Sequence, residues 1–361
     1  MPGCRLNEMN STIRYGILGT GKIASLMVNY IRESGNSDVI AVASSAKEKA
    51  IVFADKFGIK RSYGDYQALI ADAQVDAVYI ALPNSMHFEF SLKALEQGKH
   101  VLCEKPFVLQ SAQLNILENI AKKNNLRIME CFWYRFHPLV DMVIDSVKRD
   151  IGSPLGFYST FSFLNSSENN IRWNPALGGG ALYDLMCYHI DAVNYIFKPD
   201  LAQWRCLEAF SRQRNGVEAN INVEAFLSDK FQIILSASID RQSTNRTTII
   251  GTKGSLVIPN LRVSTASEEP FFYLQKDGEM RRIQAKSCNA YAGMIAAFSD
   301  ALIQNTPVPV SVKESRDNLA MIERIRASLK TEIAERIALY PAVKRKIKSM
   351  WFAFQRQPDQ W

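Results

Sequence analysis

The chain has 361 residues, of which 47% are hydrophobic and 22% are charged, and its formal charge is +7. This length is more than one hydrophobic core usually organises, which favours two domains. The diffuse positive charge suits an anionic ligand such as a nucleotide, a phosphate or a nucleotide-linked sugar. Nucleic acid is excluded as a partner, because no basic stripe interleaved with aromatic residues precedes the tail.

Neither the first residues nor the cysteines indicate a secreted or membrane protein. Residues 1–12 form an N-terminal extension without the apolar core of a secretion signal, and no apolar stretch is long enough to cross a bilayer. The six cysteines are scattered and include no C-x-x-C pair, so we expect neither a disulfide framework nor a metal site. A cytoplasmic location is expected.

Residues 13–132 alternate short apolar runs with amphipathic segments. This pattern is typical of βαβ units and predicts a doubly wound parallel sheet, the α/β architecture of a Rossmann domain. Strands are predicted at Arg14–Gly19, Val39–Ala43, Arg61–Tyr63, Ala77–Leu82, His100–Cys103 and Arg127–Cys131. Helices are predicted at Ile23–Ser34, Glu48–Phe57, Met86–Gln97 and Ser111–Asn124.

The first strand runs into a G-x-G-x-x-A turn. Such a turn seats a dinucleotide pyrophosphate at a helix N-terminus: the first glycine permits the tight turn, the second lets backbone approach the phosphates, and the small Ala24 lets the helix pack closely. An ordinary strand–helix loop is the alternative. The candidate cofactor-binding residues of this turn are Gly19, Thr20, Gly21, Lys22 and Ile23.

The end of the second strand favours NADP over NAD. NAD-binding folds place an acidic residue there for the ribose 2′-hydroxyl, whereas this chain offers Ser44, Ser45 and Lys49. Hydroxyls and a lysine suit a 2′-phosphate. The alternative is that Lys47 and Lys49 only decorate the start of a helix.

Two further strand ends place polar residues at the same edge of the sheet, where ligands bind in such folds. Leu82, Pro83, Asn84 and His87 follow the fourth strand as candidate cofactor contacts, although Asn84 also suits a helix cap. Glu104 and Lys105 follow the fifth strand. A lysine there can bind a ribose or substrate oxygen and lower the pKa of a nearby acid; a surface ion pair is the alternative.

Residues 133–338 have a different pattern, with alternating apolar residues in Ile221–Leu227 and Phe231–Ile239. Alternation predicts an open, mostly antiparallel sheet, and an α+β domain in which helices cover one face while the other face is free to pair subunits. Helices are predicted at Ala181–Phe197, Tyr291–Gln304 and Val312–Ile337. Residues 339–361 form a basic amphipathic tail opening at Pro341, for which packing against protein is favoured over a membrane surface.

A glycine-rich turn at residues 178–180 precedes the helix that carries Asp184 and Tyr188. At a spacing of four, both side chains lie on one helical face. A tyrosine hydroxyl supported by a carboxylate and an ammonium can exchange a proton at a carbinol carbon, although a structural aspartate with a core tyrosine would look the same. Arg172, Trp173 and His189 are candidate substrate contacts, with His189 about 100° away from Tyr188 around the helix.

Together these segments resemble the glucose–fructose oxidoreductase/inositol dehydrogenase (Gfo/Idh/MocA) family. The resemblance implies a Rossmann domain, a C-terminal domain with an open sheet, and NAD(P)-linked hydride transfer on sugars, polyols or related alcohols. Lys105 then matches the family's catalytic lysine, Asp184 its helix aspartate, and Tyr188 a position held by Tyr or His. The segment with Trp133 and Arg135 resembles the branch of xylose dehydrogenases, dihydrodiol dehydrogenases and nucleotide-sugar ketoreductases, where it lies near the cofactor.

The sequence therefore predicts an NADP-preferring oxidoreductase acting on a sugar or sugar-like cyclic alcohol or ketone. Tyr188 is the expected proton donor or acceptor, Lys105 lowers its pKa, and Asp184 orients them. Two departures bear on this hypothesis: position 45 is Ser where NADP-using relatives often have Arg, and the basic tail has no family counterpart. The alternatives are a trans-dihydrodiol or aldose dehydrogenase, or an NAD(P)-binding regulatory protein without turnover. A homodimer or homotetramer is expected.

Overall fold

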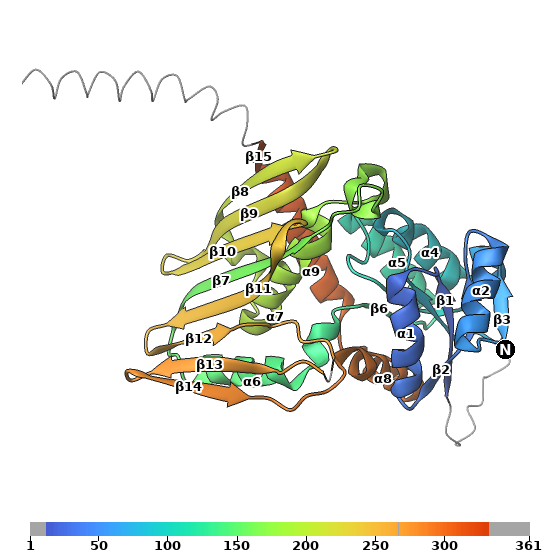
Figure 1. The fold of residues 1–361 in the computed structure, drawn as a ribbon, viewed down its shortest axis with the longest axis horizontal. Helices are drawn as coiled ribbons and strands as arrows, with labels where there is room; N and C mark the ends of the chain where they lie inside the picture. Colours follow the sequence, from blue (N-terminus) through green and yellow to red (C-terminus); the bar gives the residue numbers. More distant parts are fainter. Residues whose placement is uncertain (1–11, 266, 332–361) are drawn as a thin grey trace, which may run out of the picture.

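The computed structural model describes residues 12–265 and 267–331, so the N-terminal extension and the tail helix predicted after Pro341 lie outside the described residues. The chain forms two sheets, each with its own helices, that lie side by side (Figure 1). No helix of the described part is long and apolar enough to cross a membrane.

The first sheet has six parallel strands in the order β3-β2-β1-β4-β5-β6. This order reverses between β1 and β4, the point at which doubly wound folds bind their ligands. The strands are short, and their apolar side chains are buried on both faces by helices. The strands are β1 (Ile13–Leu18), β2 (Ser37–Ala43), β3 (Arg61–Tyr63), β4 (Ala77–Ile80), β5 (His100–Cys103) and β6 (Ile128–Glu130). The helices are α1 (Lys22–Glu33), α2 (Lys47–Phe57), α3 (Tyr66–Ile70), α4 (His87–Glu96) and α5 (Ser111–Lys123).

The second sheet has nine strands in the order β14-β13-β12-β11-β7-β10-β9-β8-β15. Its neighbours are antiparallel except for the β7–β10 and β8–β15 pairs. The strands are β7 (Pro154–Leu164), β8 (Arg205–Arg214), β9 (Val217–Ser228), β10 (Phe231–Ser238), β11 (Asp240–Gly251), β12 (Gly254–Ile258), β13 (Phe271–Lys276), β14 (Glu279–Gln284) and β15 (Leu329–Thr331). The helices after β6 are α6 (Pro138–Arg149), α7 (Cys187–Phe197), α8 (Ala290–Ile303) and α9 (Val312–Ser328).

The alternation predicted for the second sheet is present in β10. Ile233, Leu235 and Ala237 are fully buried, whereas Ile234 on the opposite face is 40% exposed. One face therefore belongs to the core and the other is open, as the period of two requires.

Two predicted helices differ from the structure. The helix predicted over Ala181–Phe197 begins with a wider π-helical turn at Leu182–Met186 before α7. The helix predicted to reach Ile337 ends at Ser328, because the following residues pair with β8 as the edge strand β15. A partner strand far along the chain thus decides where α9 ends, and helical periodicity cannot reveal it.

Helix α8 lies against the first sheet although it follows the second one in the chain (Figure 1). Its Ser299 hydroxyl is 2.9 Å from the Tyr15 hydroxyl and 2.8 Å from the Ser37 hydroxyl. Tyr291 stacks on Tyr30 of α1 with ring centroids 5.2 Å apart. These contacts fix the second domain on the first and so set the geometry of the site between them.

Candidate active site

The glycine turn between β1 and α1 lets other groups come close to the backbone. Gly19 has φ +107°, and a Cβ there would lie 2.6 Å from the carbonyl oxygen of Ala81, so the position requires glycine. Gly21 is the N-cap of α1, and a Cβ there would meet no atom within 4 Å. No side chain caps α1, so the N–H groups of its first turn remain open to a ligand. An uncapped, glycine-lined helix N-terminus fits a dinucleotide pyrophosphate.

The end of β2 lies beside this turn. The Thr20 hydroxyl is 3.3 Å from the hydroxyl of the buried Ser44, whereas the side chains of Ser45 and Lys49 are exposed. Residues 43–47 contain no carboxylate, and the first one after them is the exposed Glu48 in the first turn of α2. The local chemistry therefore fits a 2′-phosphate better than a bare ribose hydroxyl.

The loop after β4 is tied to both domains. The Asn84 amide donates to the Gly178 carbonyl oxygen at 2.8 Å, which links this loop to the glycine-rich turn of the second domain. His87 is fully buried, and its ring nitrogens lie 2.8 Å from the Pro106 carbonyl oxygen and 2.9 Å from that of Leu82. The His87 ring therefore joins the β4 and β5 loops, and its contact with a cofactor stays a prediction.

Lys105 of the first domain contacts two residues of the second domain, Asp184 and Tyr188. Its ammonium donates to the Asp184 carboxylate at 2.9 Å and to the Asp184 carbonyl oxygen at 2.7 Å. It also lies 4.9 Å from the ring centroid of Tyr188. The π-helical turn matters here, because such turns are frequent at functional sites and leave carbonyl groups free for other donors. The structure thus brings together the three residues that the sequence singled out.

Asp184 is shared by two cations. Arg172 donates to its second oxygen at 2.5 Å, so a single buried carboxylate faces Lys105 on one side and Arg172 on the other. Burial alone would raise the pKa of Asp184, but Lys105 and Arg172 together hold it well below the ordinary value. Burial lowers the pKa of Lys105, yet the Asp184 carboxylate outweighs this and leaves that pKa raised. Both groups are charged at neutral pH.

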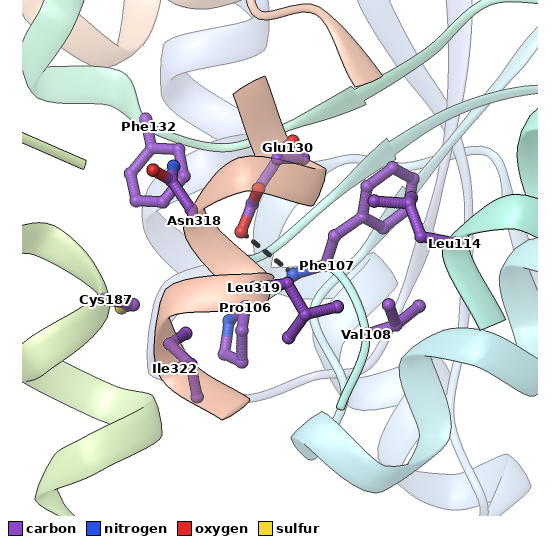
Figure 2. Close-up of a pocket in the computed structure, with 11 residues that line it drawn as sticks. Pro106, Phe107, Val108, Leu114, Glu130, Phe132, Cys187, Asn318, Leu319 and Ile322 are labelled. Atoms are coloured by element: carbon purple, nitrogen blue, oxygen red, sulfur yellow. Dashed lines mark hydrogen bonds between the residues drawn. The ribbon is translucent and has the colours of Figure 1, made fainter. Parts of the chain in front are cut away.

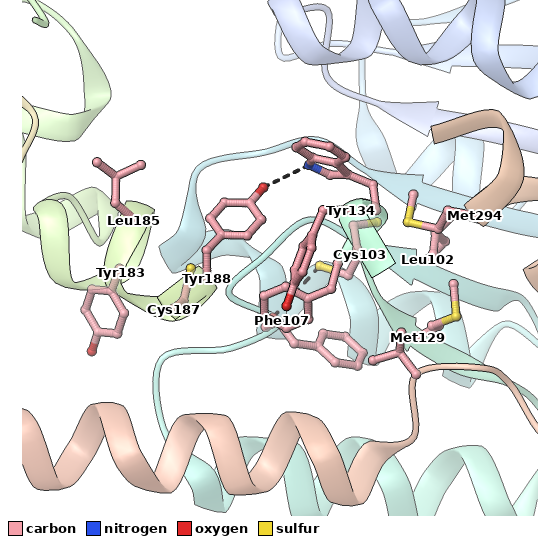
Figure 3. Close-up of a cluster of buried hydrophobic side chains, with 14 of the residues drawn as sticks. Leu102, Cys103, Phe107, Met129, Tyr134, Tyr183, Leu185, Cys187, Tyr188 and Met294 are labelled. Atoms are coloured by element: carbon pink, nitrogen blue, oxygen red, sulfur yellow. Dashed lines mark hydrogen bonds between the residues drawn. The ribbon is translucent and has the colours of Figure 1, made fainter. Parts of the chain in front are cut away.

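Tyr188 lies in an aromatic cluster (Figure 3). Its hydroxyl accepts a hydrogen bond of 2.9 Å from the indole of Trp133, and its side chain is 6% exposed. Burial raises the pKa of Tyr188 well above the ordinary value, with the nearby Glu104 carboxylate adding to the shift. The lowering expected from Lys105 does not outweigh these effects, and the ammonium gives its hydrogen bonds to Asp184 while lying 4.9 Å from the centroid of the Tyr188 ring.

Glu104 turns back into the sheet. Its carboxylate accepts a hydrogen bond of 2.5 Å from the Tyr79 hydroxyl, and burial raises its pKa. The structure therefore gives Glu104 a partner within the protein, while Lys105, the next residue, faces the second domain.

Three other residues predicted to contact a ligand are buried within the protein. Arg135 is buried and its guanidinium pairs with Asp191 and Glu314, and the predicted position of this segment near a cofactor stays a prediction. His189 is fully buried between Ser159, Ser236 and Arg262, and its contact with a substrate stays a prediction. The Trp173 ring is 4% exposed and packs under a guanidinium. The hydrogen-bond partners of Arg135 and His189 come from helices and strands far along the chain, so the local sequence does not reveal them.

Behind the Lys105 loop lies a cavity of about 10 Å³, large enough for one water at most (Figure 2). The buried Glu130 carboxylate accepts a hydrogen bond of 3.0 Å from the Phe107 N–H and thereby holds this loop on β6. Burial raises the pKa of Glu130 to about 7. Sequence reasoning missed this residue, although an acidic side chain within a buried strand is a recognisable signal.

A second hollow of about 820 Å³ lies between the ends of α6 and α7 and the start of β7. It is larger, but none of the residues predicted for the site lines it. The larger hollow is therefore not where the predicted catalytic residues lie, and we place the candidate site at Lys105. In the described ranges, no group of three or more His, Cys, Asp or Glu side chains is arranged to hold a metal ion.

The two halves of the chain match family models. An oxidoreductase family with an NAD-binding Rossmann fold matches residues 13–132, and the GFO/IDH/MocA C-terminal domain matches residues 146–257. The chain belongs to the Gfo/Idh/MocA family. It is accordingly an NAD(P)-dependent oxidoreductase, and the glycine turn described above lies within the segment that matches the NAD-binding Rossmann fold.

Relatives within the Gfo/Idh/MocA family cover most of the chain. A trans-1,2-dihydrobenzene-1,2-diol dehydrogenase from Xenopus laevis is 32% identical over 70% of this chain and 77% of its own length. A D-xylose 1-dehydrogenase (NADP(+)) from Haloferax volcanii is 29% identical over 89% of this chain and 98% of its own. The structure of a 3-ketoreductase from Actinomadura kijaniata with NADP and TDP-benzene has a TM-score of 0.84 and 25% identity, covering 89% of this chain and 98% of that chain.

Proposed function

We propose that this oxidoreductase transfers hydride between C4 of NADP(H) and a carbinol or carbonyl carbon of a sugar or sugar-like cyclic substrate, with Tyr188 as acid–base and Lys105 as its assistant. One observation carries the proposal: the Lys105 ammonium contacts both the Asp184 carboxylate, at 2.9 Å, and the Tyr188 ring, at 4.9 Å from its centroid. When bound, the nicotinamide supplies or accepts the hydride.

Tyr188 is suited to giving a proton. Burial raises the pKa of its phenol, so the group is protonated at neutral pH and available to the oxygen of a carbonyl that is being reduced. In the oxidation direction the phenol must first lose its proton. The Trp133 N–H and the Lys105 ammonium are the groups placed to stabilise the resulting phenolate.

Lys105 supplies the fixed positive charge of the site. Because Asp184 holds its ammonium in place by two contacts, the charge is preorganised and needs no rearrangement when a substrate oxygen gains negative charge. Asp184 acts as the positioning residue, and Arg172 on its other oxygen limits its movement.

The preference for NADP is supported by the end of β2. Ser44, Ser45 and Lys49 offer hydroxyls and a cation, and residues 43–47 hold no carboxylate that would repel a 2′-phosphate. The names of the xylose dehydrogenase and the 3-ketoreductase structure also include NADP.

A second candidate within the same chemistry is oxidation of a trans-dihydrodiol or an aldose. The names of the dihydrodiol and xylose dehydrogenases favour it. A screen of sugars, nucleotide sugars and cyclic diols at 340 nm, with NADP and NAD in both directions, separates the two candidates.

Lys105→Met tests the proposed mechanism directly. Losing the fixed charge should lower kcat by roughly a hundredfold or more, while NADPH binding, followed by its fluorescence, stays within a few-fold. Lys99→Met is the matched control, because Lys99 is also buried but donates only to the carbonyl oxygens of Asp72 and Val75. Unchanged turnover in Lys105→Met would reject the mechanism, and a protein that binds NADPH but turns over no substrate would favour a regulatory role.

We also propose that the protein is a homodimer or homotetramer paired through the open face of the second sheet. Ile234 on β10 and Ile250 on β11 are exposed on this part of the sheet, at 40% and 37%. Light scattering after size exclusion tests this: Ile234→Lys should shift the mass toward the monomer.

A further inference from the structure

Arg262 is a buried cation next to the candidate acid–base residue. It lies in the segment between β12 and β13, flanked by the buried Leu261 and Val263, and is 4% exposed. Its guanidinium carbon lies 4.7 Å from the ring centroid of Phe161 and 5.6 Å from that of Tyr188. Two cations, Lys105 and Arg262, therefore lie near the Tyr188 ring.

Only neutral acceptors face this guanidinium. One terminal nitrogen donates to the Asn245 side-chain oxygen at 2.9 Å and the other to His189 Nδ1 at 3.2 Å. The Nε–H is buried and has no hydrogen-bond partner. No carboxylate in the described ranges forms an ion pair with Arg262, and burial lowers its pKa to about 10.

His189 is a neutral hydrogen-bond acceptor for Arg262 and does not balance its positive charge. Its Nε2 lies 3.1 Å from the Ser236 carbonyl oxygen, which only accepts, so Nε2 carries the ring proton and Nδ1 is left to accept from Arg262. Burial, with the Arg262 charge, lowers the pKa of His189 well below the ordinary value, so the ring is neutral. The role of His189 is to hold the guanidinium.

The other buried cations near the site have anionic partners. Arg135 pairs with Asp191 and Glu314, and Lys105 shares Asp184 with Arg172. A buried charge without a counter-ion is costly, so a protein retains one where a ligand supplies the opposite charge. The Arg262 guanidinium carbon lies 5.6 Å from the centroid of the Tyr188 ring, so a group bound to Arg262 lies close to Tyr188.

We propose that Arg262 is the subsite for a negatively charged group of the substrate, an oxyanion such as a carboxylate or phosphate. This inference rests on the proposed function and narrows its substrate class to anionic sugars. The oxyanion accepts from the free Nε–H, and His189 and Asn245 keep the guanidinium oriented through neutral contacts that leave its charge uncompensated. With the guanidinium carbon 5.6 Å from the centroid of the Tyr188 ring, the bound oxyanion lies near the candidate acid–base residue.

Calorimetric titration of the full chain saturated with NADPH tests this subsite. The probes are D-glucuronate, D-glucose 6-phosphate, a nucleoside diphosphate-glucose and neutral D-glucose, which distinguish a ring carboxylate, a phosphate monoester and a diphosphate as the source of the charge. At least one charged probe should bind more tightly than D-glucose. Arg262→Gln should weaken that probe by roughly 10- to 150-fold, the range for hydrogen bonds to charged groups, and leave D-glucose unchanged.

Arg262→Lys keeps the positive charge but loses the planar guanidinium with its paired N–H donors. It is the second test variant, used if Arg262→Gln does not fold. A selective loss of the charged probe in Arg262→Lys supports the subsite. Arg246→Gln, on an exposed arginine of β11, is the control and should leave all four titrations unchanged.

The subsite is overturned if no charged probe binds more tightly than D-glucose, or if a folded Arg262 variant binds the charged probe as the wild type does. These titrations need no turnover. Full activity in Tyr188→Phe would reject the proposed acid–base role while leaving the Arg262-dependent binding intact, so the two failures are distinguishable.

Discussion

The indole N–H of Trp133 donates a hydrogen bond of 2.9 Å to the phenolic oxygen of Tyr188. Trp133 lies on the 3-10 turn after β6 (Trp133–Phe136), and its ring stacks on Tyr291 of α8 with centroids 4.7 Å apart. The phenol therefore meets a donor whose position is set by a helix packed on the first domain. A donor to the oxygen favours the phenolate, and this bond opposes the effect of burial on the pKa of Tyr188.

Trp133→Phe is expected to raise the pKa of Tyr188 further. It removes the donor but keeps an aromatic ring against Tyr291. Oxidation of an alcohol needs the phenolate, so the pH profile of kcat in that direction should move upward by roughly half to one unit, corresponding to one hydrogen bond of about 1 kcal/mol. Trp204→Phe is the control, since its indole donates to Asn194 instead, and an equal shift in both variants would contradict this role.

Gly19→Ala and Gly21→Ala should separate folding from coenzyme binding. At Gly19 an added Cβ meets the Ala81 carbonyl oxygen in a backbone conformation that alanine rarely adopts, so we expect the free energy of unfolding to fall by about 1–3 kcal/mol. At Gly21 the Cβ meets no atom, so stability should stay within about 0.5 kcal/mol while NADPH affinity falls roughly tenfold. Urea unfolding and NADPH fluorescence titration measure both. Normal NADPH affinity in Gly21→Ala would place the pyrophosphate elsewhere.

Lys49→Ala should reduce the preference for NADP without affecting NAD. Losing one exposed charge near a phosphate should lower kcat/KM with NADP by roughly two- to tenfold. The ratio of kcat/KM for the two coenzymes reports the change. Lys56→Ala, at the other end of α2, is the control, and an equal loss with NAD would show that Lys49 does not read the 2′-phosphate.

Glu130→Gln should remove a pH dependence of stability. The pKa of Glu130 is about 7 in the folded chain, above its ordinary value, so the native state holds an extra proton between about pH 4.3 and 7. Stability then falls as pH rises through that window, by at most about 4 kcal/mol, and levels off above it. Glutamine keeps an acceptor for the Phe107 N–H, so the variant should show a flatter profile in urea unfolding from pH 4.5 to 8.

The exposed Glu96→Gln serves as the control for this measurement and should keep the wild-type slope. A wild-type profile that rises with pH over the window would show that Glu130 is ionised in the native state, which contradicts the burial argument.

Local sequence alone determined the first domain and the chemistry of its strand ends. Short apolar runs and the glycine spacing predict the order of strands and helices because these features depend on neighbours within a few residues. Asp184 and Tyr188 were recognisable for the same reason. The family resemblance predicted that both residues lie near Lys105, and in the structure Lys105 contacts both of them.

Tertiary structure decided which polar side chains remain available to a ligand. His87, Arg135 and His189 resemble ligand contacts in sequence, yet carbonyls and carboxylates from distant elements occupy them. Arg262 drew no attention in sequence, and the structure gives its guanidinium only neutral hydrogen-bond acceptors and leaves its Nε–H without a partner. Burial and long-range partners set the charge and accessibility of a group, and both depend on residues far apart in the chain.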